Sequence, residues 1–172
     1  MRRSLLFFIT FLIAALFVTL VHEPVSLMIF KIREPYFICP VKIDSKSIVI
    51  RNDAGGDGEF GAKRRNGRSH TGVDIQAPIG SPVYAAKSGI AFRGNVPTGY
   101  GKYVMIYHTD GSQTMYGHLS DWNIKAAQKV HRGDIVGYVG KTGNASSKHI
   151  EPHLHFEIKK EGEPQDPLKL MR

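Results

Sequence analysis

The sequence predicts an all-β domain preceded by a single apolar helix. From Pro40 onward, glycines recur at close intervals with short runs of β-prone residues between them, which is typical of all-β domains and not of helical ones. Ahead of this region, residues 4–21 contain no charged side chain. A chain of 172 residues, 42% of them hydrophobic, has room for one domain with a real core and an appendage.

The apolar run is only just long enough to cross a membrane. Its 18 residues would rise about 27 Å as a helix, against about 30 Å for a hydrocarbon core. No small-x-small cleavage site follows it, so we expect an uncleaved anchor rather than a cleaved signal peptide or a buried helix. The leading pair Arg2-Arg3 predicts that the N-terminus stays inside and the rest of the chain lies outside. The expected layout is an anchor or uncleaved signal at 1–24, a tether at 25–38 and a folded domain at 39–172.

Seven runs are expected to form strands. The firmest prediction is a hairpin in which Thr109-Asp110-Gly111 joins two of them, because an Asp-Gly pair readily supplies the positive φ of a tight turn. Beyond the anchor, the only helix expected covers residues 121–129, with Ser120 as its cap. The expected strands are residues 47–51, 82–86, 89–93, 103–108, 112–117, 135–139 and 153–159.

Composition narrows the classes of partner. A net charge of +8 would suit nucleic acid, anionic lipid or an anionic cell-wall polymer. The densest basic cluster, Lys63-Arg64-Arg65 with Arg68, lacks the interleaved aromatic residues of a single-strand binder, and a location outside the cytoplasm argues against nucleic acid. Cys39 is the only cysteine, which excludes an intrachain disulfide, and it is expected to be a small buried hydrophobic residue.

Histidines supply the candidate chemistry. In a strand, His153 and His155 face the same way about 6.6 Å apart, so both can reach one site while Leu154 and Phe156 face the core. Two further histidines, His70 and His118, also lie in informative contexts, Ser-His-Thr-Gly-Val-Asp and Met-Tyr-Gly-His-Leu. The remaining four are expected to be solvated or packed imidazoles: His22, His108, His131 and His149.

His70 and Asp74 can share a site only if the chain turns between them. In a straight strand their Cα atoms would lie about 13 Å apart, too far for two ligands that each approach one ion to about 2 Å. Gly72 permits the turn. A helix is less suitable, because Gly72, β-branched neighbours and Pro78 are poor helix material.

Together these residues predict a catalytic metal site. Two imidazoles, one carboxylate and a fourth position for water make the open tetrahedral set of catalytic zinc. A structural site of four thiolates is excluded by the single cysteine. His70 and Asp74 are two candidate ligands, and spacing alone does not choose between His153 and His155 as the third.

An ordered series of motifs resembles the zinc peptidases of the lysostaphin and LytM type, the M23 peptidases, which cut the peptide part of bacterial peptidoglycan. The resemblance runs from Cys39 to Leu168. Its motifs are Phe60-Gly61-Ala62-Lys63-Arg64, His70-Thr71-Gly72-Val73-Asp74-Ile75, Gly99-Tyr100-Gly101, Tyr116-Gly117-His118-Leu119, Gly140-Lys141-Thr142-Gly143 and His153-Leu154-His155-Phe156-Glu157.

The resemblance implies an antiparallel sheet of the duplicated hybrid motif type, with an active-site groove and zinc on its floor. It implies one Zn²⁺ held by His70, Asp74 and His155, with His118 and His153 as catalytic residues beside a zinc-bound water that acts as nucleophile. Some relatives place a tyrosine a few residues before the first ligand, where this chain has a basic stretch.

The implied function is hydrolysis of peptide cross-links or stem peptides of peptidoglycan by a single-pass protein of the cytoplasmic membrane, with its catalytic domain in the periplasm or outside the cell. The main alternative is a non-catalytic LytM-like domain that binds or activates a cell-wall amidase. A basic protein docking on anionic lipid or nucleic acid would require the histidine pattern to be accidental. Sequence alone does not choose between a direct D-alanyl–diaminopimelate cross-link and a glycine bridge, and it does not give the oligomeric state.

Overall fold

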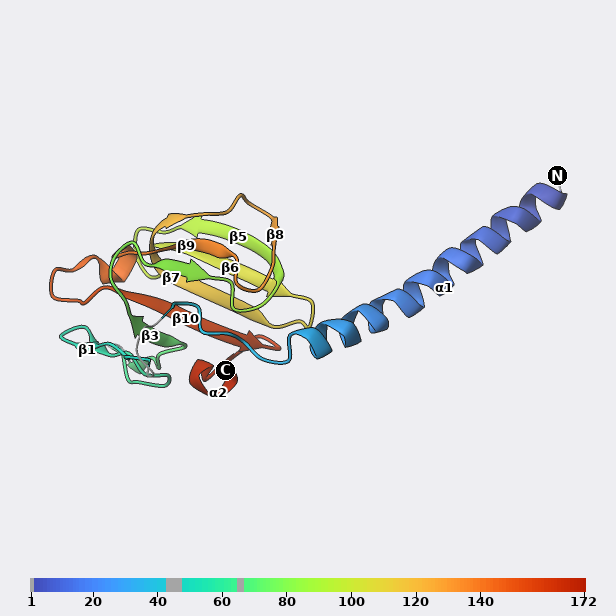
Figure 1. Cartoon of the computed structure of the whole chain (residues 1–172). Helices are drawn as coiled ribbons and strands as arrows, with labels where there is room; N and C mark the ends of the chain where they lie inside the picture. The colour runs from blue at the N-terminus through green and yellow to red at the C-terminus, as the bar shows by residue number, and fades with distance from the viewer. Residues whose placement is uncertain (1, 43–47, 65–66) are drawn as a thin grey trace. The chain divides into compact units, whose positions relative to one another are not determined.

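The computed structural model describes residues 2–42, 48–64 and 67–172, and the chain divides into two compact units, residues 1–35 and 36–172 (Figure 1). The first unit is the helix α1 (Arg2–Arg33). Its segment Leu6–Arg33, with a mean hydropathy of 2.2, is long and apolar enough to cross a membrane, by length and composition alone. The helix continues through Pro24 and over most of the expected tether.

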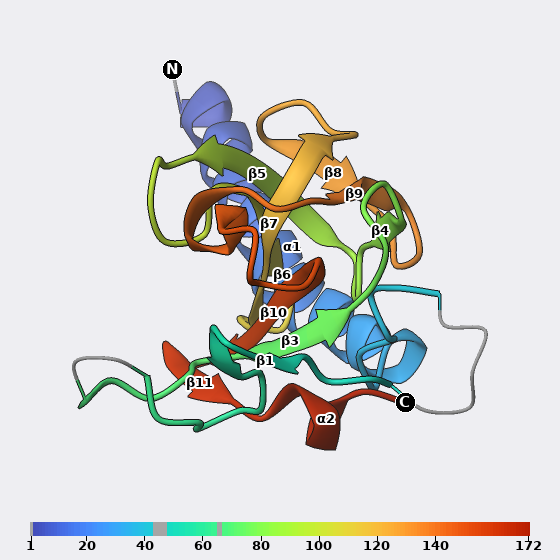
Figure 2. The same cartoon turned by 90° about the vertical axis from the view of Figure 1, so that its left-hand side faces the viewer.

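The second unit is built on a nine-stranded antiparallel sheet in the order β11-β10-β7-β6-β5-β8 (Figure 2). Strand β3 also pairs with β10, and β9 pairs with β4 and with the far end of β7. A separate hairpin, β1 with β2, precedes the sheet. The elements are β1 (Asn52–Asp53), β2 (Gly56–Asp57), β3 (Val73–Gln76), β4 (Pro82–Tyr84), β5 (Gly89–Asn95), β6 (Lys102–His108), β7 (Gln113–Trp122), β8 (Gln128–Val130), β9 (Ile135–Val139), the 3-10 helix η2 (Gly143–Ser146), β10 (His153–Lys160), β11 (Glu163–Gln165) and α2 (Pro167–Leu170).

The central strand β10 has one face in the core and the other in the candidate site. Its apolar residues Leu154, Phe156 and Ile158 are fully buried in the hydrophobic cluster. The alternate positions are polar, as expected for a strand whose side chains point to opposite faces in turn. Cys39 packs against the same cluster at a partly buried position.

Strand β7 carries a bulge at the point where it passes the site. Its pairing with β6 shifts between Val104↔Tyr116 and Lys102↔Leu119, so two residues of β7 oppose one of β6. The extra residue is His118, which has a φ of 63°. Bulges often redirect a side chain beside a functional site, and this bulge directs an imidazole.

Most of the predicted β structure is confirmed. The all-β, antiparallel domain is present, and β6 and β7 form the expected hairpin, with Gly111 at a φ of 80° in its turn. The short strands β1, β2, β3, β8 and β11 were not predicted. Phe37 is also part of the core, so the compact unit begins ahead of the expected boundary at residue 39.

Two predictions are wrong. Residues 121–129 do not form a helix: Asp121 and Trp122 end β7 and pair with β9, whereas Gln128 and Lys129 begin β8 and pair with β5. Ser120 lies within β7 and donates to the carbonyl of Val139 instead of capping a helix. Residues 48–51 form no strand, only an isolated bridge between Ile50 and Ile75, and residue 47 lies outside the described residues.

Candidate metal centre

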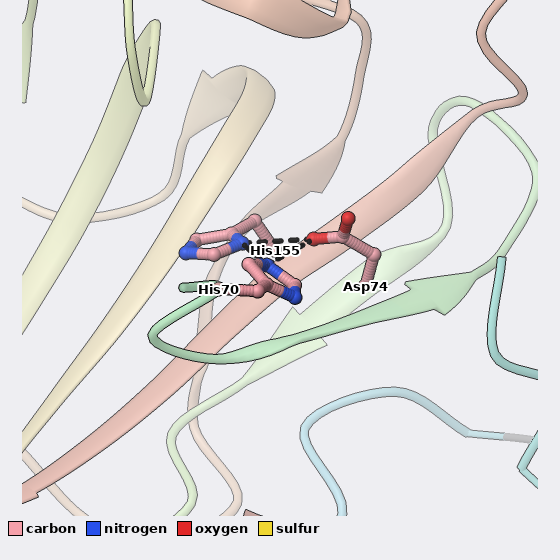
Figure 3. Close-up of side chains that lie close together, drawn as sticks. All are labelled: His70, Asp74 and His155. Carbon is pink, nitrogen blue, oxygen red and sulfur yellow. Dashed lines mark hydrogen bonds and ion pairs between the residues drawn. The ribbon is translucent and has the colours of Figure 1, made fainter. Parts of the chain in front are cut away.

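Three buried side chains converge on one point between β3 and β10 (Figure 3). Asp74 and His155 are directly opposite each other in the antiparallel pairing of these strands. His70 precedes β3 and reaches the same point because the chain bends at Gly72. The bend demanded by the four-residue spacing is therefore present.

Gly72 is required for a different reason from the one expected. Its backbone does not have a positive φ. A Cβ at this position would instead overlap the carbonyl oxygen of Phe156 and lie 2.8 Å from Cγ of Glu157. Glycine thus lets the segment that carries two candidate ligands approach the strand that carries the third.

The three donor atoms have the spacing of a zinc site. His155 Nδ1 lies 2.8 Å from Asp74 Oδ1 and 3.0 Å from His70 Nε2, and the third side, from His70 Nε2 to Asp74 Oδ1, is 3.2 Å. Tetrahedral zinc with bonds of about 2.0–2.1 Å separates its ligand atoms by about 3.3 Å. Small outward movements would therefore accommodate the ion, and two imidazoles with one carboxylate suit zinc better than calcium or magnesium.

The second oxygen of Asp74 is already engaged by cations. Oδ2 accepts hydrogen bonds from Arg51 Nη2 at 2.8 Å and from Arg64 Nη2 at 3.0 Å, leaving Oδ1 to face the histidines. Burial alone would raise the pKa of Asp74, but hydrogen bonds from His155 and His70 hold it well below its usual range. This carboxyl is therefore ionised throughout the neutral range.

His155 lies between two carboxylates. Its Nε2 is 3.0 Å from Glu157 Oε1, on the side of the ring opposite Asp74. Burial alone would lower the pKa of His155, but the hydrogen bonds to Asp74 and Glu157 raise it to about 9. Burial would likewise raise the pKa of Glu157, yet the hydrogen bond from His155 lowers it to about 2.

The two other predicted histidines lie beside this triad with one ring nitrogen each turned to a carbonyl. His118 donates from Nδ1 to Thr142 O at 2.9 Å, and His153 donates from Nδ1 to Glu151 O at 2.7 Å. Their rings are 5.0 Å apart, and the ring of His118 is 5.8 Å from that of His155. Burial lowers the pKa of both, that of His118 to about 3, so both are neutral at pH 7. Nε2 of His153 lies 3.9 Å from Asp74 Oδ1.

Several residues of the site were not predicted. Arg51, Tyr100 and Glu157 contact the triad or its partners, and sequence reasoning assigned them no role. Glu157 had a usable signal, since it continues the alternation of His153 and His155 along β10. Arg51 had none. The tyrosine beside the triad is Tyr100, whose ring centroid is 5.4 Å from that of His155, and Arg64 of the basic stretch contacts Asp74.

Comparisons with known proteins identify similar peptidases. The chain is 42% identical over 104 residues to the DD-carboxypeptidase/endopeptidase Mpg of Neisseria meningitidis; this covers 60% of the chain but only 23% of that relative. A zinc containing peptidase from Vibrio cholerae matches 77% of the chain and 39% of its own length, with a TM-score of 0.62 and 31% identity. The catalytic domain of lysostaphin from Staphylococcus simulans matches 64% of the chain and 86% of its own length, with a TM-score of 0.56 and 35% identity.

The family assignment follows from the extent of the match. The model of peptidase family M23 matches residues 68–167, which contain every histidine and carboxylate of the site described above. This region is more than half of the chain. The chain therefore belongs to peptidase family M23.

Proposed function

We propose that the chain is a zinc-dependent endopeptidase that hydrolyses peptide cross-links or stem peptides of bacterial peptidoglycan. The observation that supports this most directly is the complete set of side chains at one point. Three buried donors form a triangle of zinc-site dimensions, and two neutral imidazoles lie beside it, each with Nδ1 turned to a backbone carbonyl. A domain that had lost catalysis is expected to have lost members of such a set.

In this proposal His70 Nε2, Asp74 Oδ1 and His155 Nδ1 hold one Zn²⁺. The ion supplies Lewis acidity, which polarises the scissile carbonyl and makes a water molecule acidic enough to attack at neutral pH. His118 and His153 handle the protons. Each can accept the water's proton at Nε2 and then, as an imidazolium, steady the oxyanion or protonate the leaving amine.

Arg51 and Arg64 support this chemistry through Asp74. Because both guanidinium groups bond to Oδ2, the carboxylate is fixed in orientation and offers a single oxygen to the ion. Their positive charges also draw electron density from the carboxylate, which leaves the metal a stronger Lewis acid. The burial of Arg51 and Asp74 strengthens their interaction.

The test uses the full chain purified in detergent. Zinc content per chain is measured by elemental analysis, and purified peptidoglycan sacculi are then digested and the released fragments identified by mass spectrometry. We expect one zinc per chain and release of muropeptides that a chelator abolishes and added zinc restores. The masses of the products identify the bond that is cut.

Variants separate metal ligands from proton carriers. Alanine at a ligand should remove both zinc and hydrolysis, whereas alanine at a proton carrier should abolish hydrolysis and leave zinc content largely unchanged. Zinc loss in His153→Ala with zinc retention in His155→Ala would reverse the assignment. The first group is His70→Ala, Asp74→Ala and His155→Ala, and the second is His118→Ala and His153→Ala.

The same experiment distinguishes the alternative function. A metal-free wild-type protein that releases nothing from sacculi would contradict the proposed hydrolase. It would leave a LytM-like domain that binds or activates a cell-wall amidase, a function that requires a protein partner and no metal.

We further propose that α1 is a single-pass anchor in the cytoplasmic membrane, with the M23 domain on its outer side. Its segment Leu6–Arg33 is long and apolar enough to cross a membrane, and peptidoglycan lies outside the cytoplasmic membrane. Resistance of the protein to carbonate extraction and digestion of residues 36–172 by protease added to spheroplasts are the expected results. Release by carbonate, or full protection in spheroplasts, would contradict the proposed topology.

A further inference from the structure

Glu157 is a buried carboxylate that has no role in the hydrolysis proposed above. It is 1% exposed and lies two residues after His155 on β10. Its Oε1 accepts three hydrogen bonds, from His155 Nε2 at 3.0 Å, from the Tyr100 hydroxyl at 2.8 Å and from the Thr71 hydroxyl at 2.5 Å. Three separate segments of the domain thus meet on one oxygen atom.

The rings of the other three histidines of the site are oriented differently from that of His155. Each places Nδ1 against a backbone carbonyl, which can only accept a hydrogen bond, so Nδ1 must carry the proton and Nε2 the lone pair. His155 is reversed: Nδ1 faces Asp74 and His70, and Nε2 faces Glu157. The three carbonyl contacts are His70 with Glu59 O at 2.9 Å, His118 with Thr142 O at 2.9 Å and His153 with Glu151 O at 2.7 Å.

We propose that Glu157 is a positioning residue of the metal centre, which holds the proton of His155 on Nε2 so that Nδ1 presents its lone pair to the ion. This inference rests on the proposed zinc peptidase function. A carboxylate fixes the imidazole more strongly than a carbonyl does, because a hydrogen bond to a charged acceptor is shorter and stronger. Partners of this kind orient a metal-binding histidine and increase its strength as a ligand.

Tyr100 extends the effect of Glu157 to a proton carrier. Its hydroxyl bonds to Glu157, its ring packs against His155, and its backbone carbonyl accepts the N–H of His118 at 2.7 Å. That bond holds the bulged residue His118 at its positive φ. One tyrosine therefore connects the orientation of a metal ligand with the orientation of a catalytic imidazole.

Gly117 lies next to both His155 and Tyr100. It lies opposite His155 in the pairing of β7 with β10. A Cβ there would lie 3.4 Å from His155 Cβ and 3.4 Å from Tyr100 Cδ1. Both residues therefore pack against β7 at a position without a side chain.

The test compares Glu157→Gln with the wild type as full chains in detergent. Glutamine keeps the size of the side chain but removes its charge, and its amide can turn N–H toward His155. Zinc affinity is measured at pH 9.5 by competition with a chelator, so that competition from protons contributes little to the comparison. We expect affinity to fall about 10–100-fold, while the matched control Glu163→Gln, an exposed glutamate on β11, keeps wild-type affinity.

Nitrogen-15 NMR of histidine-labelled, zinc-loaded wild-type protein supplies a readout that needs no folded variant. We expect the ring proton of His155 on Nε2, and on Nδ1 for His70, His118 and His153. Tyr100→Phe, which keeps the ring and the carbonyl but removes the hydroxyl, is expected to weaken zinc binding less than Glu157→Gln does.

The outcomes separate the two proposals. Wild-type zinc affinity in Glu157→Gln, or a zinc-loaded wild type with the His155 proton on Nδ1, would overturn the positioning role and leave the hydrolase intact. A wild-type protein that binds no zinc at all would overturn the proposed function, and the positioning role with it. A loss of affinity in Glu157→Gln without a change in the thermal unfolding of the metal-free protein supports the proposal.

Discussion

Zinc affinity of this site should rise with pH over a range in which an ordinary histidine ligand would leave it constant. Burial alone would lower the pKa of His155, but its hydrogen bonds to Asp74 and Glu157 raise it to about 9. A ligand must lose its proton before it can bind the metal. At pH 7 the protonated form of a group with a pKa of about 9 exceeds the neutral form by about 100 to 1. Zinc must displace this proton, so its apparent affinity at pH 7 should be about 100-fold weaker than at high pH, a difference of about 2.7 kcal/mol.

The sign of the effect follows from the direction of the shift. Because the pKa of His155 is raised, the metal-free site binds one proton more than the zinc-loaded site below pH 9, and zinc binding releases it. Asp74 contributes nothing to the pH dependence of zinc affinity, because its pKa is held far below this range. The logarithm of the zinc association constant should therefore rise by about one for each pH unit between 7 and 9 and then level off.

The assay is chelator competition from pH 6.5 to 9.5, corrected for proton binding by the chelator and for zinc hydrolysis. Release of one proton per zinc at pH 7.5, measured by calorimetry in two buffers of different ionisation enthalpy, gives an independent check. A zinc association constant that does not change above pH 7.5 would refute the reasoning, because it would mean that the pKa of His155 is near its ordinary value. Removing one of the two carboxylates in Glu157→Gln should move the plateau to lower pH.

Three further variants separate stability from metal binding. Gly72→Ala should destabilise the fold by about 1–3 kcal/mol and also weaken zinc binding, because its Cβ would overlap the carbonyl of Phe156 and force the two ligand-bearing segments apart; lower stability with unchanged affinity would contradict this. His118→Asn should abolish hydrolysis and lower the free energy of unfolding by only about 0.5–1.5 kcal/mol in urea denaturation, because it removes the hydrogen bond to Thr142 O while asparagine, like histidine, tolerates a φ of 63°. Lys87→Met leaves Asp110 without the buried cation now 2.7 Å away, so it should cost about 3–5 kcal/mol of stability while zinc affinity stays at the wild-type value.

The parts of the fold that could be predicted are those in which the local pattern and the tertiary environment agree. Residues 153–159 alternate polar and apolar side chains, and the strand observed there buries Leu154 and Phe156 while it turns its histidines to the site. The turn between β6 and β7 needs a positive φ, and Gly111 supplies it. In both cases a single physical requirement is visible in the residue types themselves.

Residues 121–129 show where such reasoning fails. Lysine, alanine and glutamine in this segment favour a helix locally, but its two ends are taken by pairing with β9 and β5. Ala127 even adopts a φ of 55° in the connection. The gain from extending two sheet edges outweighs helix propensities that amount to only a few tenths of a kcal/mol per residue, and no local pattern reports which strands lie nearby.

The orientation of the four imidazoles marks the limit of prediction within the site itself. His70, His118 and His153 are each oriented by a backbone carbonyl, and because every residue has a carbonyl, no sequence pattern distinguishes those that perform this task. Glu157 differs, since its acceptor belongs to a side chain and its place two residues after His155 puts it on the ligand face of the same strand. A histidine that binds metal through Nδ1 needs an acceptor at Nε2, on the side of the ring turned away from the ion, and the next outward position of its own strand supplies one. The spacing His-x-Glu on a strand can therefore indicate which nitrogen faces the metal, although the spacing His-x-His on the same strand could not indicate which histidine binds it.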